Sequence, residues 1–147
     1  METAISVHTF NVNMKWDPET GTGMGRSGNR MPLVFGPPPE FGGTEFTWSP
    51  EHLLAAAVSS CYTNTFLHFA RLLKLSVTVF RIAAHVDFEK GKAGFEATRF
   101  VLRPVIAFHH IPSQTVLDDL FAKAKKYCFV SNSVKGSITV EPHVLQG

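Results

Sequence analysis

The clearest pattern of apolar and polar positions lies in the second half of the chain. Between Val77 and Glu89, apolar side chains occupy every second position, and polar side chains fill most of the positions between them. The apolar set is Phe80, Ile82, Ala84, Val86 and Phe88. This alternation predicts a β-strand with one buried face. Residues 90–94 contain two glycines and two lysines, so we expect a turn there and a returning strand over 95–108.

A different periodicity predicts two helices. Ser49, Pro50 and Glu51 combine an N-cap residue, a proline suited to the first helical position and a first-turn acid, so a helix should run from Pro50 to about Lys74. Its apolar residues surround the helix almost completely, which predicts burial on most sides and favours a dimer. Ser113 should cap a second helix, whose apolar stripe extends to Cys128.

The remaining segments are shorter. Residues 5–16 alternate and predict a strand, 17–29 are turn-rich and predict a wide loop, and 31–35 predict an edge strand because Pro32 cannot donate to a ladder. A last strand is expected over 137–141. Together these elements predict a single α+β domain over 1–147, with helices packed against antiparallel sheet.

Composition excludes some classes of function. The net charge of +2 comes from scattered Lys and Arg, which does not favour nucleic-acid binding. The chain starts without a basic stretch followed by an apolar one, so we expect no export signal and a cytoplasmic protein. The long helix carries too many polar residues for a membrane span. Thirteen Phe in 147 residues require a large core or a second subunit to cover them.

The candidate chemistry rests on the two cysteines of the chain, Cys61 and Cys128. Each lies in a predicted helix, and neither has the spacing of a metal knuckle or a secreted disulfide scaffold. Such a pair suggests a peroxide-reacting thiol and the thiol that resolves it. The alternative for Cys61 is a small buried apolar residue, and for Cys128 an ordinary member of a helix stripe.

Three segments resemble the OsmC/organic hydroperoxide resistance family. They are residues 38–43 (PPEFGG), 48–61 (WSPEHLLAAAVSSC) and 126–136 (KYCFVSNSVKG). The order of predicted elements also matches that family along essentially the whole chain. In its hydroperoxide resistance branch the second cysteine is usually followed by Pro-Tyr-Ser, whereas this chain has Phe129-Val130-Ser131.

The resemblance implies an OsmC-like fold: an intertwined homodimer with sheets wrapped around long central helices and two sites at the subunit interface. It implies thiol-dependent reduction of organic hydroperoxides, with Cys61 as the peroxidatic thiol and Cys128 as its disulfide partner. Glu51 matches the family's glutamate, and Arg26 matches its arginine, with Arg30 as second choice. A dithiol, a lipoyl group or a thioredoxin-like protein would return the disulfide to thiols, and no cofactor is implied.

The chemistry explains why an arginine is expected. A free thiol is mostly protonated at neutral pH, and only the thiolate attacks an O–O bond well. Cys61 lies about three turns inside its helix, beyond the reach of the helix dipole, and burial disfavours its thiolate. A guanidinium held by Glu51 would therefore activate it and stabilise the departing alkoxide. Taken alone, Glu51 is an ordinary first-turn acid and Arg26 a solvated loop charge.

Other interpretations are kept open. Phe41 and Phe129 would line an apolar channel for a bulky peroxide, or else belong to the core or dimer interface. A metal site is not expected, because Cys61 and His68 lie about 10 Å apart along a helix and adjacent histidines on a strand face opposite ways. The rival functions are a non-enzymatic dimer that binds a small apolar molecule and an acyl transferase that uses Cys61.

Overall fold

The computed structural model describes residues 6–147 and divides the chain into two compact units. The first unit ends at His52, and the second runs from Leu53 to Gly147. The prediction of a single domain over 1–147 stays a prediction. Part of the expected strand over 5–16, Ile5 itself, lies outside the described residues.

The first unit contains a three-stranded antiparallel sheet. Its strands are β1 (Asn13–Asp17), β2 (Thr22–Arg26) and β3 (Leu33–Phe35), in that order across the sheet. The expected strand over 5–16 is therefore shorter than predicted, because β2 ends at Arg26, which pairs with Asn13 at the first position of β1. The expectation that β3 is an edge strand is confirmed, since it is the last strand of its sheet and, besides β2, it forms only an isolated bridge from Phe35 to Trp48 in the described chain. A short 3₁₀ helix, η1 (Pro39–Phe41), follows.

The glycine-rich segment 17–29 is not the wide loop that we expected, because β2 lies within it. Gly23 and Gly25 of β2 lie under large side chains of the neighbouring strands. A Cβ atom at Gly23 would collide with the ring of Phe35, and one at Gly25 would lie 2.7 Å from Sδ of Met14. Here glycine makes room for large neighbours on a strand, a role that sequence alone does not separate from turn formation.

Helix α1 (Pro50–Leu72) agrees closely with the predicted helix. The backbone N–H of His52 donates to Oγ of Ser49 at 3.2 Å, which confirms Ser49 as the cap. Within this chain only one stripe of α1 is buried, at every fourth position: Val58, Tyr62, Phe66 and Ala70. The expectation of burial on most sides is therefore not met within a single chain.

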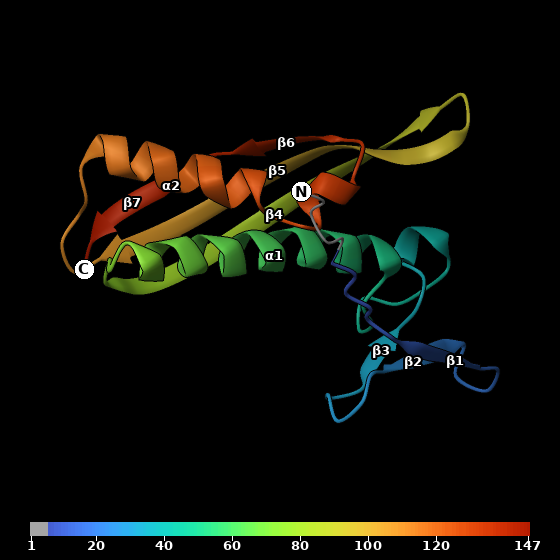
Figure 1. Ribbon diagram of the computed structural model, residues 1–147. Helices are drawn as coiled ribbons and strands as arrows, with labels where there is room; N and C mark the ends of the chain where they lie inside the picture. Colours follow the sequence, from blue (N-terminus) through green and yellow to red (C-terminus); the bar gives the residue numbers. More distant parts are fainter. Residues whose placement is uncertain (1–5) are drawn as a thin grey trace. The chain divides into compact units, whose positions relative to one another are not determined.

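The second unit contains a four-stranded sheet covered on one face by two helices (Figure 1). The strands are β4 (Val77–Gly91), β5 (Gly94–Phe108), β6 (Ser137–Val140) and β7 (His143–Gln146), and the second helix is α2 (Gln114–Lys126). The β4–β5 hairpin is antiparallel as predicted, whereas β6 and β7 both run parallel to β5. The expectation of an antiparallel sheet is therefore wrong for β6, and β7 was not predicted. The chain returns to β5 through α2, and a crossover through a helix gives parallel pairing.

One hydrophobic core holds the helices on this sheet. The buried residues of α1 pack with Phe100, Leu102, Ile106 and Phe108 of β5 and with Leu117, Leu120 and Ala124 of α2. Phe66 lies at the centre, with its ring centroid 5.2 Å from that of Phe80 and 5.5 Å from that of Phe121. The N-cap of α2 is confirmed too, since Ser113 accepts a hydrogen bond from the N–H of Val116 at 3.4 Å.

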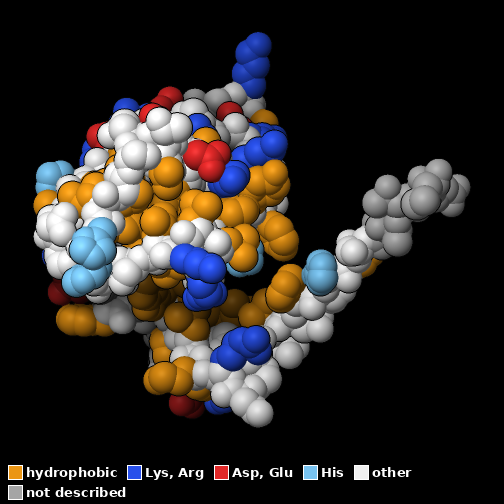
Figure 2. Space-filling view, turned by 60° about the vertical axis from the view of Figure 1, so that its left-hand side comes forward, with side chains coloured by type: hydrophobic (Ala, Val, Ile, Leu, Met, Phe, Trp, Pro, Cys, Tyr) orange, Lys and Arg blue, Asp and Glu red, His pale blue; other side chains and the backbone are white. Residues whose placement is uncertain are grey.

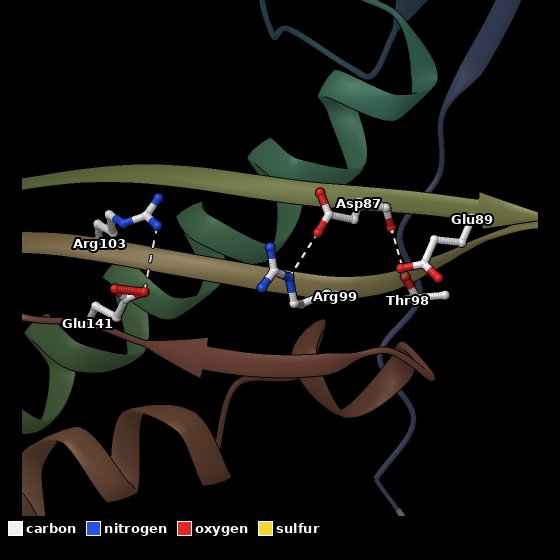
Figure 3. Close-up of polar contacts among 6 residues, drawn as sticks. All are labelled: Asp87, Glu89, Thr98, Arg99, Arg103 and Glu141. Atoms are coloured by element: carbon white, nitrogen blue, oxygen red, sulfur yellow. Dashed lines mark hydrogen bonds and ion pairs between the residues drawn. The ribbon is translucent and has the colours of Figure 1, made fainter.

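Exposed side chains of this sheet form polar contacts with one another (Figure 3). Nε of Arg99 donates to Asp87 at 2.8 Å, Thr98 donates to Glu89 at 2.9 Å, and Arg103 lies 3.6 Å from Glu141. Exposed pairs of this kind contribute up to about 1 kcal/mol each. The core therefore outweighs them in stabilising the second unit.

Large apolar side chains are exposed in the first unit. Phe10, Val12, Met14 and Trp16, expected to share the buried face of a strand, are between 54% and 83% exposed. Hydrophobic side chains are plainly visible on the surface in Figure 2. Isolated exposed apolar residues are normal in folded proteins, whereas a set of four aromatic and aliphatic residues within seven positions is unusual.

Candidate active site

Cys61 lies on α1 at the edge of the buried stripe and is half-buried. It opens into a cavity of about 370 Å³ that lies wholly within the second unit. Helix α1 contributes Ala57, Ser60, Asn64 and Thr65 to the lining, and the segment after α2 contributes Tyr127, Phe129 and Val130. The hydroxyl of Thr65 donates to the backbone carbonyl of Cys61 at 2.8 Å, so the Thr65 hydroxyl already has a hydrogen-bond partner within the helix.

Cys128 is fully buried, but it does not lie in a helix as the sequence predicted. Helix α2 ends at Lys126, and Cys128 belongs to the turn that follows. Asn132 stabilises this ending: its side-chain amide donates to the carbonyl of Lys126 at 3.0 Å, and its backbone N–H donates to the carbonyl of Cys128 at 3.1 Å. The last carbonyls of a helix need hydrogen-bond donors from outside the helix, and the apolar stripe does not indicate which residue supplies them.

The fold brings the two cysteines together as free thiols. Burial raises the pKa of the Cys128 thiol, and the neighbouring Cys61 side chain raises it further. The residues on both sides of Cys128, Tyr127 and Phe129, line the same cavity as Cys61. The juxtaposition of two thiols 67 positions apart in the sequence is therefore a feature of the fold.

Two hydroxyl groups that the sequence analysis did not select lie around Cys128. Ser131 is 9% exposed, and both its hydroxyl and its backbone N–H lower the pKa of Cys128. Among the described residues that hydroxyl has no hydrogen-bond partner. Tyr62 is fully buried beside Cys61 in sequence, and the pKa of its phenol is raised by burial and then by Cys128. The Cys-Phe-Val-Ser sequence was the available signal for Ser131.

The raised pKa of Cys128 predicts a pH dependence of stability. The folded protein keeps this proton at pH values where the unfolded chain, with a thiol pKa near 8.5, has lost it. The stabilisation is therefore complete below about pH 8.5 and falls as the pH rises toward the folded value. We expect the free energy of unfolding, measured in urea under reducing conditions, to decrease from about pH 8 to 9.5. The free energy of unfolding of a Cys128→Ser variant should decrease less over the same pH range. Equal decreases in the variant and the wild-type chain would show that Cys128 does not cause this pH dependence.

Glu51 lies at a second cavity, of about 440 Å³, which belongs to the first unit. Trp16, Phe35, Phe41 and the glycines of β2 form much of its lining. One carboxylate oxygen of Glu51, Oε2, is buried and has no hydrogen-bond partner among residues 6–147. Burying a carboxylate oxygen without a hydrogen-bond donor costs free energy, so Oε2 of Glu51 is free to accept a hydrogen bond from a donor outside residues 6–147.

The predicted arginines do not supply that donor within the described chain. Trp16, Gly23 and Phe35 lie opposite one another in the sheet register, which places them on the face of the Glu51 cavity. Arg26 lies at an odd offset from Gly23 and so points to the opposite face, where its Nη2 donates to Sδ of Met24 at 3.2 Å. Arg30 is exposed, and its Nη1 donates to the carbonyl of Ser27 at 3.4 Å.

The two predicted wall residues lie at different cavities. Phe129 lines the Cys61 cavity and is 71% exposed, whereas Phe41 lines the Glu51 cavity. Neither belongs to the core of its unit. Their roles in binding a peroxide stay predictions.

Residues 6–147 include neither a cluster of metal ligands nor a membrane-spanning helix. Within that range no three His, Cys, Asp or Glu side chains are grouped as metal ligands would be. No helix there has the length and apolar character needed to cross a membrane.

Comparisons with known proteins agree with this fold. A family model described as OsmC-like protein matches residues 42–143. The peroxiredoxin OsmC of Escherichia coli (strain K12) is 30% identical over 93 residues, which are 63% of this chain and 64% of the relative. The match thus spans less than two thirds of that relative's length.

Solved structures cover nearly the whole chain. An OsmC-like protein of unknown function from Vibrio cholerae has a TM-score of 0.85 at 22% identity, covering 92% of this chain and 99% of its own. An organic hydroperoxide resistance protein from Elizabethkingia anophelis has a TM-score of 0.74 at 22% identity, covering 97% and 99%. At this identity the structures establish the fold: the predicted α+β, OsmC-like fold class is confirmed.

Proposed function

Because this chain belongs to the OsmC-like protein family, we propose that it is a thiol peroxidase that reduces organic hydroperoxides to alcohols. The observation that carries the proposal is the proximity of the Cys61 and Cys128 thiols, one half-buried at a cavity and the other fully buried. Relatives named as a peroxiredoxin and as a hydroperoxide resistance protein support it.

The proposed reaction uses the two thiols in turn. The Cys61 thiolate attacks the outer peroxide oxygen, the O–O bond breaks, and the alkoxide leaves and takes a proton to become the alcohol. Cys61 is then a sulfenic acid, and Cys128 displaces its oxygen as water to form a disulfide. A dithiol reductant, such as a lipoyl group or a thioredoxin-like protein, returns both residues to thiols by exchange.

Glu51 and an arginine complete the proposed site. The unpaired buried oxygen of Glu51 supports its assignment as the group that holds a guanidinium. Arg26 lies on the wrong face of its own sheet for this contact, so we propose that a second copy of the chain brings Arg26, or Arg30, to Glu51. The exposed apolar residues of the first unit support the homodimer. The proposed location is the cytoplasm, where thiols are kept reduced.

The cavity suits an organic substrate. Phe129 and Val130 give the Cys61 cavity an apolar wall, and Ser60 and Asn64 add polar residues to its lining. A volume of about 370 Å³ accommodates a hydroperoxide of aryl or alkyl size. We propose Phe129 as the wall residue at Cys61 and Phe41 as the wall residue at Glu51.

The first test is to map the thiols after one turnover. The reduced protein is mixed with one equivalent of cumene hydroperoxide, its free thiols are alkylated, and it is digested without reductant. Trypsin releases Cys61 in residues 31–71 and Cys128 in residues 127–135, so a linked pair is recognised directly by mass. We expect this linkage within seconds, together with one equivalent of cumyl alcohol. Two free thiols would instead support the non-enzymatic dimer that binds an apolar molecule.

A further inference from the structure

The two thiols differ in their access to molecules from outside. Cys61 is half-buried and lines a cavity of about 370 Å³, whereas Cys128 is fully buried. The residues on both sides of Cys128 are exposed, Tyr127 by 48% and Phe129 by 71%. The Cys128 thiol is therefore covered although its neighbours along the chain lie at the surface. Its burial depends on the conformation of the segment that carries it, residues 127–133, called here the Cys128 turn.

Hydrogen bonds from two residues hold the backbone of the Cys128 turn. The backbone N–H of Asn132 donates to the carbonyl of Cys128 at 3.1 Å, and its side-chain amide donates to the carbonyl of Lys126 at 3.0 Å. One residue thus ties the turn both to the end of α2 and to the buried cysteine. The hydroxyl of Ser133 donates to a third carbonyl, that of Phe129, at 2.9 Å.

The contact with Lys126 is the one that depends on asparagine. A backbone N–H is present in every residue except proline, so the contact with Cys128 does not require a particular side chain. The contact with Lys126 requires a side chain with an N–H or O–H donor. Lys126 is the last residue of α2, where carbonyls have no donor within the helix. Removing the Asn132 amide would therefore favour local opening of the turn.

We propose that the side chain of Asn132 keeps the turn closed over Cys128, so that molecules from outside reach the thiols of this unit only at Cys61. The closed turn itself does not depend on peroxide chemistry, whereas its role in a reaction rests on the proposed function. Asn132 acts through the cysteine that it covers and is therefore a positioning residue.

The closed turn determines which sulfur of a disulfide a reductant attacks. A thiol that enters the cavity meets the Cys61 sulfur, because the Cys128 sulfur is buried under the turn. The incoming thiolate bonds to Cys61, the bond between the two cysteines breaks, and Cys128 leaves as a thiolate that takes a proton from water. The second thiol of a dithiol then displaces Cys61 as a thiolate, and the dithiol leaves as a disulfide. Peroxide and dithiol would thus compete for one cavity.

The first test uses the reduced protein without peroxide. Initial rates of alkylation by iodoacetamide are measured separately for Cys61 and Cys128 in the native state, with the modified peptides identified by mass. Asn132→Ala removes the amide, and Asn132→Asp keeps its shape without an N–H donor. A net hydrogen bond changes an equilibrium constant by roughly fivefold, so both variants should raise the rate at Cys128 by about fivefold or more. The rate at Cys61 should stay within about twofold of the wild-type value.

Gln114→Ala is the matched control. Gln114 begins α2, and its side-chain amide donates to Asp118 at 2.8 Å, so this variant removes a similar hydrogen bond at the other end of the helix. It should leave the rate at Cys128 within about twofold of the wild-type value. An unchanged rate at Cys128 in Asn132→Ala, or an equal increase in Gln114→Ala, would overturn the inference.

The second test uses the oxidised protein. Diamide forms the disulfide without peroxide, and a brief pulse of 2-mercaptoethanol followed by acid traps the mixed disulfide. We expect the wild-type adduct on residues 31–71, the tryptic peptide of Cys61, and an about fivefold larger share on residues 127–135 in Asn132→Ala. A wild-type adduct mainly on Cys128 would contradict the closed turn. If both tests give the expected results but the protein does not consume hydroperoxide, the inference stands and only the proposed function falls.

Discussion

A Cys61→Ser variant is expected to lose hydroperoxide reduction by a factor on the order of a thousand or more, because it removes the nucleophile on which every later step depends. A serine hydroxyl is hardly ionised at neutral pH, and its oxygen cannot form the sulfenic acid that Cys128 resolves. The change replaces one atom of a half-buried side chain, so the fold should be retained. The measurement is consumption of cumene hydroperoxide with dithiothreitol as reductant.

The matched control is the same substitution at the other thiol. A Cys128→Ser variant keeps the residue that meets the peroxide and should consume about one equivalent without added thiol. It should then stop at the sulfenic acid, which a sulfenic-acid reagent detects. If Cys61→Ser retained turnover within tenfold of the wild-type chain, as it would in a reaction led by Cys128, the assignment of roles would be wrong.

The largest expected effect on stability is that of Phe66→Ala, with a loss of about 3–5 kcal/mol in the free energy of unfolding. Phe66 is fully buried and contacts aromatic rings from β4 and α2 as well as Tyr62 of its own helix. Removing its ring leaves a cavity where the two helices and the sheet meet. Urea unfolding followed by circular dichroism, at one fixed protein concentration, measures the loss.

The control for Phe66 is a phenylalanine of the same unit that is not buried. Phe95, at the start of the returning strand of the hairpin, is 69% exposed, and Phe95→Ala should cost less than about 1 kcal/mol. Similar losses at the two positions would mean that the core does not centre on Phe66, or that a second chain covers Phe95.

The elements that were predictable from sequence are those whose signals are local. The cap at Ser49, the cap at Ser113 and the alternation from Val77 to Phe108 involve residues within a few positions of each other, and all three are confirmed. The segment around Gly23 and Gly25 was misread because the reason for glycine there, the ring of Phe35 and the side chain of Met14, comes from neighbouring strands.

In the candidate site, too, local features were predictable from sequence and features that depend on distant residues were not. Cys61 and Cys128 could be selected as a pair, because they are the two thiols of the chain. The end of α2 before Cys128 depends on the amide of Asn132, six residues beyond Lys126, which helical periodicity does not register. The face on which Arg26 lies follows from strand register, and the sequence interpretation did not identify β2 as a strand.

The separation of the two thiols along the chain gives the redox state a thermodynamic signature. A disulfide between Cys61 and Cys128 would close a loop of 67 residues, and a covalent loop of that size reduces the entropy of the unfolded chain by an amount worth about 4 kcal/mol. The oxidised form would melt at a higher temperature than the reduced form. A reductant would then do more than reset the chemistry, since each cycle would also loosen the contact between α1 and the turn after α2.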